Sequence, residues 1–214
     1  MPGMKTSSAI PGGNVPASAA STWRWARRVA VQWLQRRLGL AVRLDTADRR
    51  LLEQCILPYY AARADVRSVL FVGVGWYTEA YEALFAGRRY VTLDMDPGVA
   101  RHGSRQHHVV GSAVEAGQLF GPGAFDLVVF NGVFGWGLDE RADVNAALES
   151  FHHVLRPGGE LVVGWNDVAS RRPYEFSSSE ALRHFEPVTL PPLGVAQLQL
   201  ETDNRHRFEF YRRP

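Results

Sequence analysis

Two glycines separated by one residue, with a carboxylate about twenty residues further on, give the strongest chemical signal in this chain. Gly73 and Gly75 follow the apolar run 69–72 and precede a segment that can form a helix. Glycine has no Cβ, so such a turn lets the backbone approach a ligand closely, and the first N–H groups of the helix point to the same place. Asp94 ends the next apolar run, and at this spacing its carboxylate can accept hydrogen bonds from both hydroxyls of a ribose. We therefore predict a site for a nucleotide-like ligand.

Glycines and aromatic residues alternate after the most apolar run, 125–130. The stretch 130–138, which contains Phe134 and Trp136, suits neither a helix nor a solvated loop. If 125–130 is a buried strand, this stretch lies at the sheet edge where ligands bind, and Trp136 is predicted to line a substrate pocket. Packing of the loop under the N-terminal helices is an equally weighted alternative. Trp165 and Asn166 follow another apolar run, so Trp165 could stack on a substrate and Asn166 could hydrogen-bond it.

No side chain is identified as a catalytic base. Asp139, Asp167, His107 and His108 are candidates, but none has a partner in the sequence that supports the role. The histidines lack cysteines or carboxylates at the spacing of metal ligands, so no metal site is predicted. The catalytic residues therefore stay unassigned.

Apolar runs alternate with helix-like segments from residue 66 onward. Strands are expected at 69–72, 90–93, 109–110, 125–130 and 161–163, and helices at 79–85 and 144–155. Continuous apolar strands separated by helices indicate a parallel sheet that is covered on both faces. The turn-like pair Asp203-Asn204 between 197–201 and 207–211 predicts an antiparallel hairpin. The predicted fold class is α/β, with a doubly wound, mostly parallel seven-stranded sheet, a terminal antiparallel hairpin and an N-terminal helical extension.

The first 60 residues differ in composition from the remainder. Residues 1–21 are rich in Pro, Gly, Ser and Ala and are predicted to be a disordered tail. In residues 22–44 tryptophans and arginines recur at helical spacings, which predicts an amphipathic helix. This helix could pack on the core or on a second subunit, or could contact an anionic membrane surface. A second helix is expected over 46–57, ended by Pro58. The predicted organisation is a tail (1–21), a helical extension (22–60) and a Rossmann-like domain (61–214).

The composition narrows the class of protein. The chain has 214 residues, 46% of them hydrophobic, and a net charge of +2, which fits one domain with a real core and disfavours a nucleic-acid partner. Cys55 is the single cysteine, so an intrachain disulfide is excluded. We find no bilayer-spanning apolar run and no apolar centre of a secretory signal, so we expect a cytoplasmic protein. The oligomeric state is not predicted.

The order of these motifs resembles the class I S-adenosylmethionine-dependent methyltransferases. The resemblance rests on 69–75, 91–94, 125–130 and 155–161, covers roughly 66–211, and is most specific around Pro157-Gly158-Gly159. It implies S-adenosylmethionine as cofactor and a small-molecule methyl acceptor. It also implies roles for individual residues at the cofactor. These are Gly73, Val74 and Gly75 at the methionine part, Asp94 at the ribose, Met95 on the adenine, Ser112 and Ala113 at the adenine edge, and Asn131 near the sulfonium.

Three residues depart from the family pattern. Phe71 stands in place of an acidic residue, Tyr77 in place of a third glycine, and Ser112 in place of an aspartate. One interpretation is an active enzyme with a modified pocket, in which the Tyr77 ring faces the sulfonium or the substrate. The other is a catalytically inactive binding domain that docks to a partner or a membrane through its basic N-terminal helix. A dinucleotide dehydrogenase fits less well, since it would need a glycine at Thr78.

Overall fold

The structure, a computed structural model, describes residues 44–214. The tail predicted over 1–21 and the amphipathic helix predicted over 22–44 lie outside the described residues, apart from Leu44. The described residues belong to one compact unit. No helix within them is long and apolar enough to cross a bilayer.

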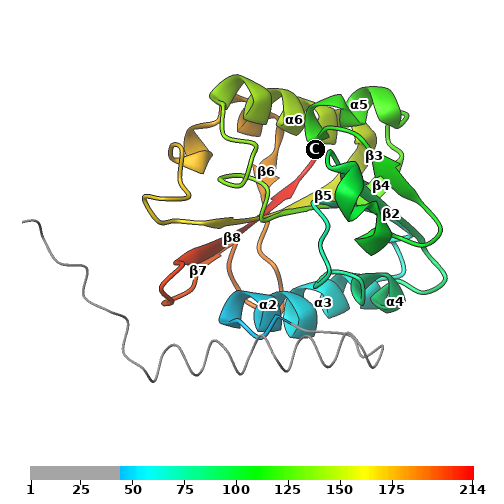
Figure 1. The fold of residues 1–214 in the computed structure, drawn as a ribbon, viewed down its shortest axis with the longest axis horizontal. Helices are drawn as coiled ribbons and strands as arrows, with labels where there is room; N and C mark the ends of the chain where they lie inside the picture. Colours follow the sequence, from blue (N-terminus) through cyan, green and yellow to red (C-terminus); the bar gives the residue numbers. More distant parts are fainter. Residues whose placement is uncertain (1–43) are drawn as a thin grey trace, which may run out of the picture. The chain divides into compact units, whose positions relative to one another are not determined.

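The sheet is mostly parallel, as predicted (Figure 1). Its strand order is β3-β2-β1-β4-β5-β8-β6, and β7 also pairs with β8. β8 runs antiparallel to β5 and to β7, which confirms the terminal hairpin. The sheet has eight strands in the seven side-by-side positions that were expected. β6 and β7 share the last position, because they pair with different residues of β8. The strands are β1 (Ser68–Val72), β2 (Arg89–Asp94), β3 (His108–Val110), β4 (Phe125–Asn131), β5 (Leu155–Asn166), β6 (Glu186–Pro187), β7 (Gln197–Gln199) and β8 (His206–Arg212).

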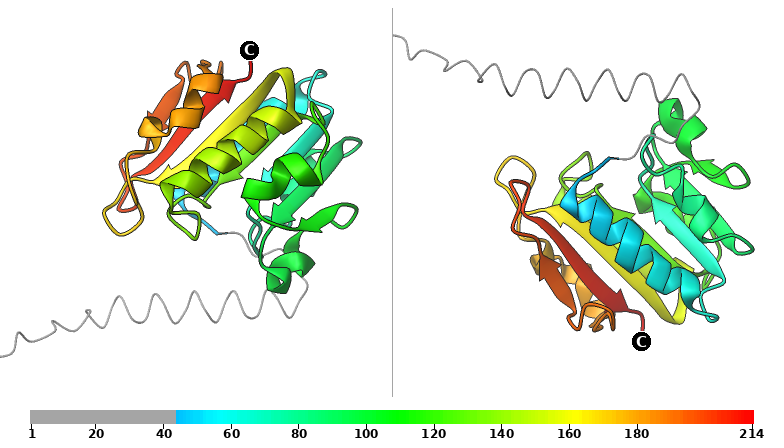
Figure 2. Two further views of the ribbon diagram at one scale, coloured as in Figure 1. Left: turned by 90° about the horizontal axis from the view of Figure 1, so that it is seen from above. Right: turned by 90° about the horizontal axis from the view of Figure 1, so that it is seen from below.

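Helices cover both faces of the sheet, which gives three layers (Figure 2). α5 and α6 lie on the face seen in the left view, and α2 and α3 lie across the opposite face in the right view. The helices are α2 (Ala47–Leu51), α3 (Leu57–Ala62), α4 (Tyr81–Leu84), α5 (Ala116–Leu119) and α6 (Arg141–Val154). Between α2 and α3 lies a π-helical turn (Leu52–Ile56), and short 3₁₀ turns occur at Pro97–His102, Ala113–Glu115, Phe176–Ser178 and Glu180–His184.

The packing of β4 explains why its sequence is continuously apolar. Val128 and Phe130 belong to the core under α6, whereas Leu127 and Val129 belong to the core under α2 and α3. Successive side chains of a strand point to opposite faces, so a strand covered on both faces must be apolar at every position. Each face therefore has its own hydrophobic core, with β4 between them.

Pro58 does not end the first helix, contrary to the prediction. The helical path continues through α3 to Ala62, and Pro58 lies at the beginning of α3, just after the π-helical turn. A proline is tolerated in the first turn of a helix because its missing N–H is not needed there. The wide turn thus lets the helix pass a residue that would break a regular one.

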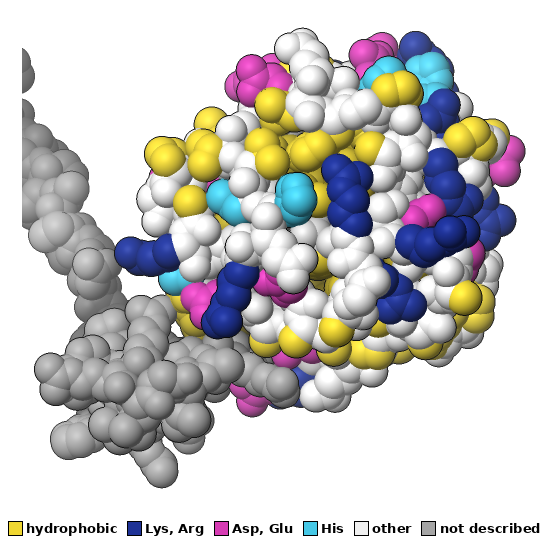
Figure 3. Space-filling model, turned by 90° about the vertical axis from the view of Figure 1, so that its right-hand side faces the viewer, with side chains coloured by type: hydrophobic (Ala, Val, Ile, Leu, Met, Phe, Trp, Pro, Cys, Tyr) yellow, Lys and Arg dark blue, Asp and Glu magenta, His cyan; other side chains and the backbone are white. Residues whose placement is uncertain are grey.

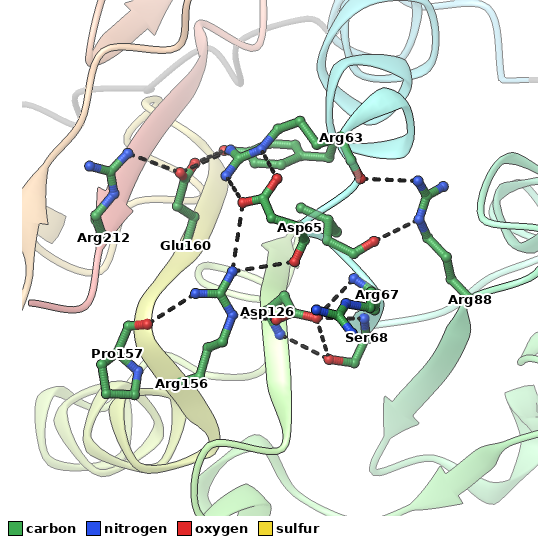
Figure 4. Close-up of polar contacts among 12 residues, drawn as sticks. Arg63, Asp65, Arg67, Ser68, Arg88, Asp126, Arg156, Pro157, Glu160 and Arg212 are labelled. Atoms are coloured by element: carbon green, nitrogen blue, oxygen red, sulfur yellow. Dashed lines mark hydrogen bonds and ion pairs between the residues drawn. The ribbon is translucent and has the colours of Figure 1, made fainter.

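A polar network ties the amino ends of the strands together, on the opposite edge from the predicted ligand site (Figure 4). The Asp126 carboxylate accepts hydrogen bonds from the Ser68 backbone N–H (2.8 Å) and hydroxyl (2.7 Å), and from the Arg156 guanidinium. Burial acts to raise the pKa of Asp126, but the hydrogen bonds from Arg156 and Ser68 outweigh it and lower the pKa. The network therefore links β1, β4 and β5 through one ionised carboxylate.

Glu160 of β5 is the second centre of this network. Its carboxylate is 3% exposed and accepts hydrogen bonds from the Tyr60 hydroxyl (2.9 Å), Arg63 (2.9 Å) and Arg212 (3.2 Å). Burial raises the pKa of the Tyr60 hydroxyl, and the Glu160 charge adds to that shift. Tyr60 and Arg63 belong to α3 and its end, so Glu160 fastens this helical segment to the middle of the sheet (Figure 4).

Candidate active site

A cavity lies where β1, β2 and β4 end, and its volume is about 260 Å³. β1 lies between β2 and β4, so the strand order reverses at β1. β2 and β3 follow on one side of β1, and β4 and β5 follow on the other. In open α/β sheets, ligands bind in the crevice at such a point. Most of the predicted site residues line the cavity: Gly73, Val74, Tyr77, Asp94, Met95, Ser112, Ala113, Asn131 and Trp136.

Asp94 organises the glycine turn in this structure. Its Oδ2 accepts a hydrogen bond from the Val74 backbone N–H (2.8 Å), and its Oδ1 accepts one from Asp96 N–H (2.9 Å). Asp96 itself caps the following 3₁₀ turn by accepting from Gly98 N–H (2.8 Å), as expected for the residue before Pro97. The two carboxylates therefore have separate environments, and only Asp94 faces the cavity.

Gly73 and Gly75 are needed for different reasons. Gly73 has a φ of +84°, and a Cβ there would lie 2.6 Å from Cγ2 of Val133, which also lines the cavity. At Gly75 a Cβ would lie 2.9 Å from the Tyr77 ring. Gly75 thus does not line the cavity itself; its missing side chain makes room for Tyr77, which does.

Tyr77 forms the wall of the cavity beside this turn. Its ring is packed against Gly75 on one side, and the guanidinium carbon of Arg49 lies 4.4 Å from the ring centroid. Thr78 closes the turn, because its hydroxyl donates to the Gly75 carbonyl (2.9 Å) and accepts from the Gly75 N–H (3.1 Å). The large ring that replaces the expected glycine is therefore accommodated in a fixed position.

Arg49 of α2 was not predicted as part of the site. It is 7% exposed, and its Nη1 donates to the Tyr81 hydroxyl (3.3 Å). Arg49, Leu52 and Ile56 are spaced by three and four residues, so they share one helix face, and the latter two are fully buried. This spacing could have identified Arg49 from the sequence, because an arginine on the apolar face of a helix points toward the core.

Phe71 fills the position at which the family has an acidic residue. Its side chain is fully buried, and its ring packs edge-on against the Tyr81 ring at 5.5 Å between centroids. It belongs to the core under α2 and α3 and does not line the cavity. This side of the sheet is therefore built around an apolar residue at position 71.

Asn131 is joined to two residues from other strands. Its side-chain amide lies 3.1 Å from Nε2 of His206, whose Nδ1 lies 2.6 Å from the Asn166 amide oxygen. Burial lowers the pKa of His206 to about 4, so the imidazole is neutral at pH 7. Both asparagines present their amide oxygen to the ring, and a neutral imidazole has one N–H, so it donates to one of the two oxygens. Asn166 does not line the cavity; it orients His206, which in turn orients Asn131.

Trp165 and Trp136 have opposite surroundings. Trp165 is fully buried, its Nε1 donates to Glu209 (3.0 Å), and it packs edge-on against Phe134. It has no free face, which corrects the expectation that it stacks on a substrate. Trp136 is 53% exposed and lines the cavity, with the Arg171 guanidinium 3.5 Å from its ring centroid.

The rim near β2 and β3 is apolar and open. Met95 is 69% exposed at the edge of the cavity, and Ser112 caps the turn that follows β3 by accepting from Val114 N–H (3.2 Å). Val110 and Leu119 are also exposed. Figure 3 shows the right-hand side of the molecule as drawn in Figure 1, where arginine side chains are dispersed among hydrophobic and uncharged ones.

The candidate bases do not gather at the cavity. Asp167 accepts hydrogen bonds from Arg172 (2.7 Å) and Gln199 (3.0 Å), and His108 is bonded to the Thr92 hydroxyl (2.9 Å). Neither residue lines the cavity, nor do His107 and Asp139. Within residues 44–214, the cavity is lined by backbone, apolar, hydroxyl and amide groups and by one carboxylate, that of Asp94.

Residues 70–163 match the family model described as a methyltransferase domain. These residues are similar to a methyltransferase domain. The matched range runs from β1 to β5 and includes the whole lining of the cavity. No curated protein sequence matches the chain significantly.

Several solved methyltransferase structures share the fold of this chain. The N-methyltransferase NodS from Bradyrhizobium japonicum WM9, in complex with S-adenosyl-L-homocysteine, is 19% identical with a TM-score of 0.62, over 79% of this chain and 89% of that one. The 1,6-didemethyltoxoflavin-N1-methyltransferase from Burkholderia thailandensis is 20% identical with a TM-score of 0.56, over 94% and 93%. A TehB-like methyltransferase from Corynebacterium glutamicum is 19% identical with a TM-score of 0.56, over 91% and 99%. These likenesses establish the class I methyltransferase fold.

Proposed function

We propose that the protein transfers a methyl group from S-adenosylmethionine to a small-molecule acceptor. The observation that carries the proposal is the Asp94 carboxylate facing a cavity beside a close-approach glycine turn, within a methyltransferase domain. S-adenosylmethionine supplies a methyl group on a positively charged sulfur. Two of the similar structures contain its demethylated product, S-adenosylhomocysteine.

The residues of the cavity fit this cofactor. Gly73 leaves no Cβ between the backbone and the ligand, and Asp94 can accept from two ribose hydroxyls. Met95 offers an exposed thioether at the rim for adenine, and Ser112 and Ala113 lie on the adjacent wall. Asn131 lies at the end of β4, where we place the sulfonium.

The aromatic and amide residues of the cavity have a positioning role in this proposal. Tyr77 forms one wall of the site, and Trp136 gives a flat wall for the acceptor. Methyl transfer is an in-line attack, so holding the two reactants in line supplies much of the rate. Since the one carboxylate among the described residues of the cavity, Asp94, is assigned to the ribose, a nitrogen or thiol acceptor is favoured over a hydroxyl.

Titration calorimetry with S-adenosylmethionine and S-adenosylhomocysteine tests the proposal. We expect dissociation constants in the micromolar range, about −8 kcal/mol. Adenosine alone serves as the control and should bind more weakly, because it lacks the methionine part. A folded protein that binds neither compound would contradict the proposal and favour a binding domain without enzymatic activity.

A further inference from the structure

Tyr77 brings a free hydroxyl to the cavity. The residue lines the cavity and is half-buried. Its hydroxyl makes no hydrogen bond with the described residues, and it is not enclosed in the core as the Tyr90 hydroxyl is. The family has a glycine at this position, so the hydroxyl is a property of this chain and has no role in the family pattern.

The packing around Tyr77 fixes its ring. The guanidinium carbon of Arg49 lies 4.4 Å from the ring centroid, so this face of the ring is covered. The place of a Cβ on Gly75 lies 2.9 Å from Cε1 and 3.0 Å from Cζ, so the ring also rests against the Gly75 backbone. Trp76 packs edge-on, with 5.3 Å between the centroids. A hydroxyl on a ring that is already held can bind a ligand with little further loss of side-chain entropy.

The Tyr77 oxygen also differs from the other side-chain oxygens of the cavity, which belong to Asp94, Ser112 and Asn131. Asp94 accepts hydrogen bonds from two backbone N–H groups, and Ser112 caps a turn. The Asn131 oxygen faces the His206 ring. A phenol oxygen can accept a hydrogen bond as well as donate one. Among the side chains described at the cavity, Tyr77 therefore offers an acceptor oxygen that the chain itself does not use.

Tyr77 lies toward the end of the cavity at which we place the sulfonium. Nη2 of Arg49 lies 3.7 Å from the place of a Cβ on Gly132, and the same guanidinium covers the Tyr77 ring. Gly132 is the first residue after β4. Met95 and Ser112, where we place the adenine, instead follow β2 and β3. The hydroxyl is therefore on the side of the cavity where a methyl group would be transferred.

We propose that the Tyr77 hydroxyl binds the attacking nitrogen of the methyl acceptor by accepting a hydrogen bond from its N–H. This inference rests on the proposed function and narrows the acceptor to a compound with an N–H nucleophile. The nitrogen lone pair forms the bond to the methyl carbon, and the bond from that carbon to sulfur breaks with its electron pair going to sulfur. The nitrogen then releases its proton to water. Tyr77 exchanges no proton in this step; it aims the lone pair, which holds the reactants in line.

Calorimetry with two adenosyl ligands tests the contact in the full-length protein. Sinefungin carries an amine at the place of the transferred methyl group, and S-adenosylhomocysteine carries nothing there. The sinefungin amine therefore stands in for the acceptor nitrogen. Tyr77→Phe removes the hydroxyl alone and should weaken sinefungin about 10-fold or more, as expected for a hydrogen bond to a charged group. The affinity for S-adenosylhomocysteine should change by less than about twofold, because this ligand has no N–H at that place.

Tyr59→Phe is the matched control. Tyr59 is also half-buried, its hydroxyl makes no hydrogen bond with the described residues, and an arginine, Arg63, lies 5.6 Å from its ring centroid. Tyr59 does not line the cavity, so both affinities should equal those of the wild type. In thermal unfolding Tyr77→Phe should melt with the wild type, because its hydroxyl has no partner in the described chain to lose.

Three results would overturn the inference. Unchanged affinities in Tyr77→Phe would show that the hydroxyl does not reach the place of the methyl group. Equal weakening of both ligands would assign the hydroxyl to a part that the two ligands share. A clearly lower melting temperature would show that the hydroxyl has a partner within the chain. In each case the wild type still binds S-adenosylhomocysteine, so the proposed function stands. A wild type that binds neither ligand contradicts the proposed function and the inference together.

Discussion

Asp94 uses both of its carboxylate oxygens to hold backbone N–H groups, one at Val74 in the glycine turn and one at Asp96. A ligand that took hydrogen bonds from the same oxygens would meet a carboxylate that is already fixed in place. Asp96, two residues later, serves the chain alone by capping a 3₁₀ turn. The two aspartates are two residues apart but have different roles, so substitutions at these two positions can be compared directly.

Replacing Asp94 with Asn should weaken binding of S-adenosylhomocysteine by about tenfold or more, because two charge-assisted hydrogen bonds to the ribose are lost. The amide keeps the shape of the side chain and one acceptor oxygen, but its NH2 group would face the other backbone N–H, so the melting temperature should also fall. Binding is therefore compared at a temperature at which the variant is folded. Calorimetry gives the affinity, and Asp96→Asn, which does not line the cavity, is the control. Equal affinities in the two variants would exclude Asp94 from the binding site.

The burial of His206 predicts that the stability of the protein depends on pH. Its pKa is about 4 in the folded protein, chiefly through burial, and Asp48 and Arg49 act on it in opposite directions. The unfolded chain, with a pKa near 6.5, takes up the proton first as pH falls. Stability is therefore fully present above about pH 6.5 and is lost as pH falls toward 4, by about 3 kcal/mol.

Urea unfolding of the wild type and of His206→Gln at pH 7 and pH 4 measures this loss. The variant should show the smaller decrease, since glutamine does not titrate. His108 and His152 also have lowered pKa values through burial, but they contribute to both proteins and cancel in the comparison. The same pH dependence in both proteins would show that His206 is not buried in its neutral form.

Individual residues were predictable where their position on the chain decides their place in the fold. Gly73 and Asp94 follow strands, so the ends of those strands place them at the cavity. The position of Trp165 was not predictable. The side to which it points depends on the register of β5, and a shift of one residue exchanges the two faces of the sheet. Arg49 was missed because a buried arginine is rare, although its spacing with Leu52 placed it on the inner face of the helix.

At the scale of elements, the turn between β1 and α4 is sensitive to substitution at Gly73. Gly73→Ala and Gly87→Ala both place a Cβ on a residue with positive φ, +84° and +79°, so both should cost about 1 to 2 kcal/mol in stability through backbone strain. At Gly73 the Cβ would also meet Val133 at 2.6 Å, whereas at Gly87 nothing lies within 4 Å. Gly73→Ala should therefore be the less stable protein in urea unfolding.

The same pair separates stability from binding. Gly73→Ala should weaken S-adenosylhomocysteine in calorimetry, because it moves the backbone or Val133 at the cavity, and Gly87→Ala should leave the affinity unchanged. If the two variants bind alike, the turn at Gly73 does not approach the ligand.

Elements with a long apolar pattern were the most predictable. α6 and the strands β1 to β4, β7 and β8 were placed to within a few residues, since burial dictates their sequence. β5 begins at Leu155, six residues before the predicted strand 161–163, and the short β6 was not predicted. α4 was expected over 79–85 but is regular over Tyr81–Leu84 alone, because Thr78 and Gly75 form their own turn before it. The passage of the first helix through Pro58 depends on a π-helical turn, for which sequence patterns give no signal.

At the scale of the whole molecule, the two ends of the parallel strands have different roles. The carboxyl ends of the strands carry the cavity, while the amino ends carry the network around Asp126 and Glu160 (Figure 4). Changes in the network should therefore affect stability without changing the affinity for the cofactor.

Glu160→Gln tests this separation. The amide cannot balance the charges of Arg63 and Arg212, so unfolding should become easier by about 3 kcal/mol, the cost of breaking a buried ion pair. Glu186→Gln, the same change at an exposed position of β6, should stay within about 0.5 kcal/mol of the wild type. Urea unfolding gives both values. A loss of S-adenosylhomocysteine affinity in folded Glu160→Gln would show that the two edges are coupled.

β8 follows every other described strand in sequence, yet it lies inside the sheet between β5 and the β6–β7 position. During synthesis on a ribosome, β5 must therefore wait with an unpaired edge until residue 212 has emerged. The first residue of β8 is His206, which holds Asn131 at the cavity. The nascent chain thus completes its sheet in a single late step, and a chain that is stopped before residue 206 would lack β8, the pairing of β6 and β7, and the side chain that holds Asn131.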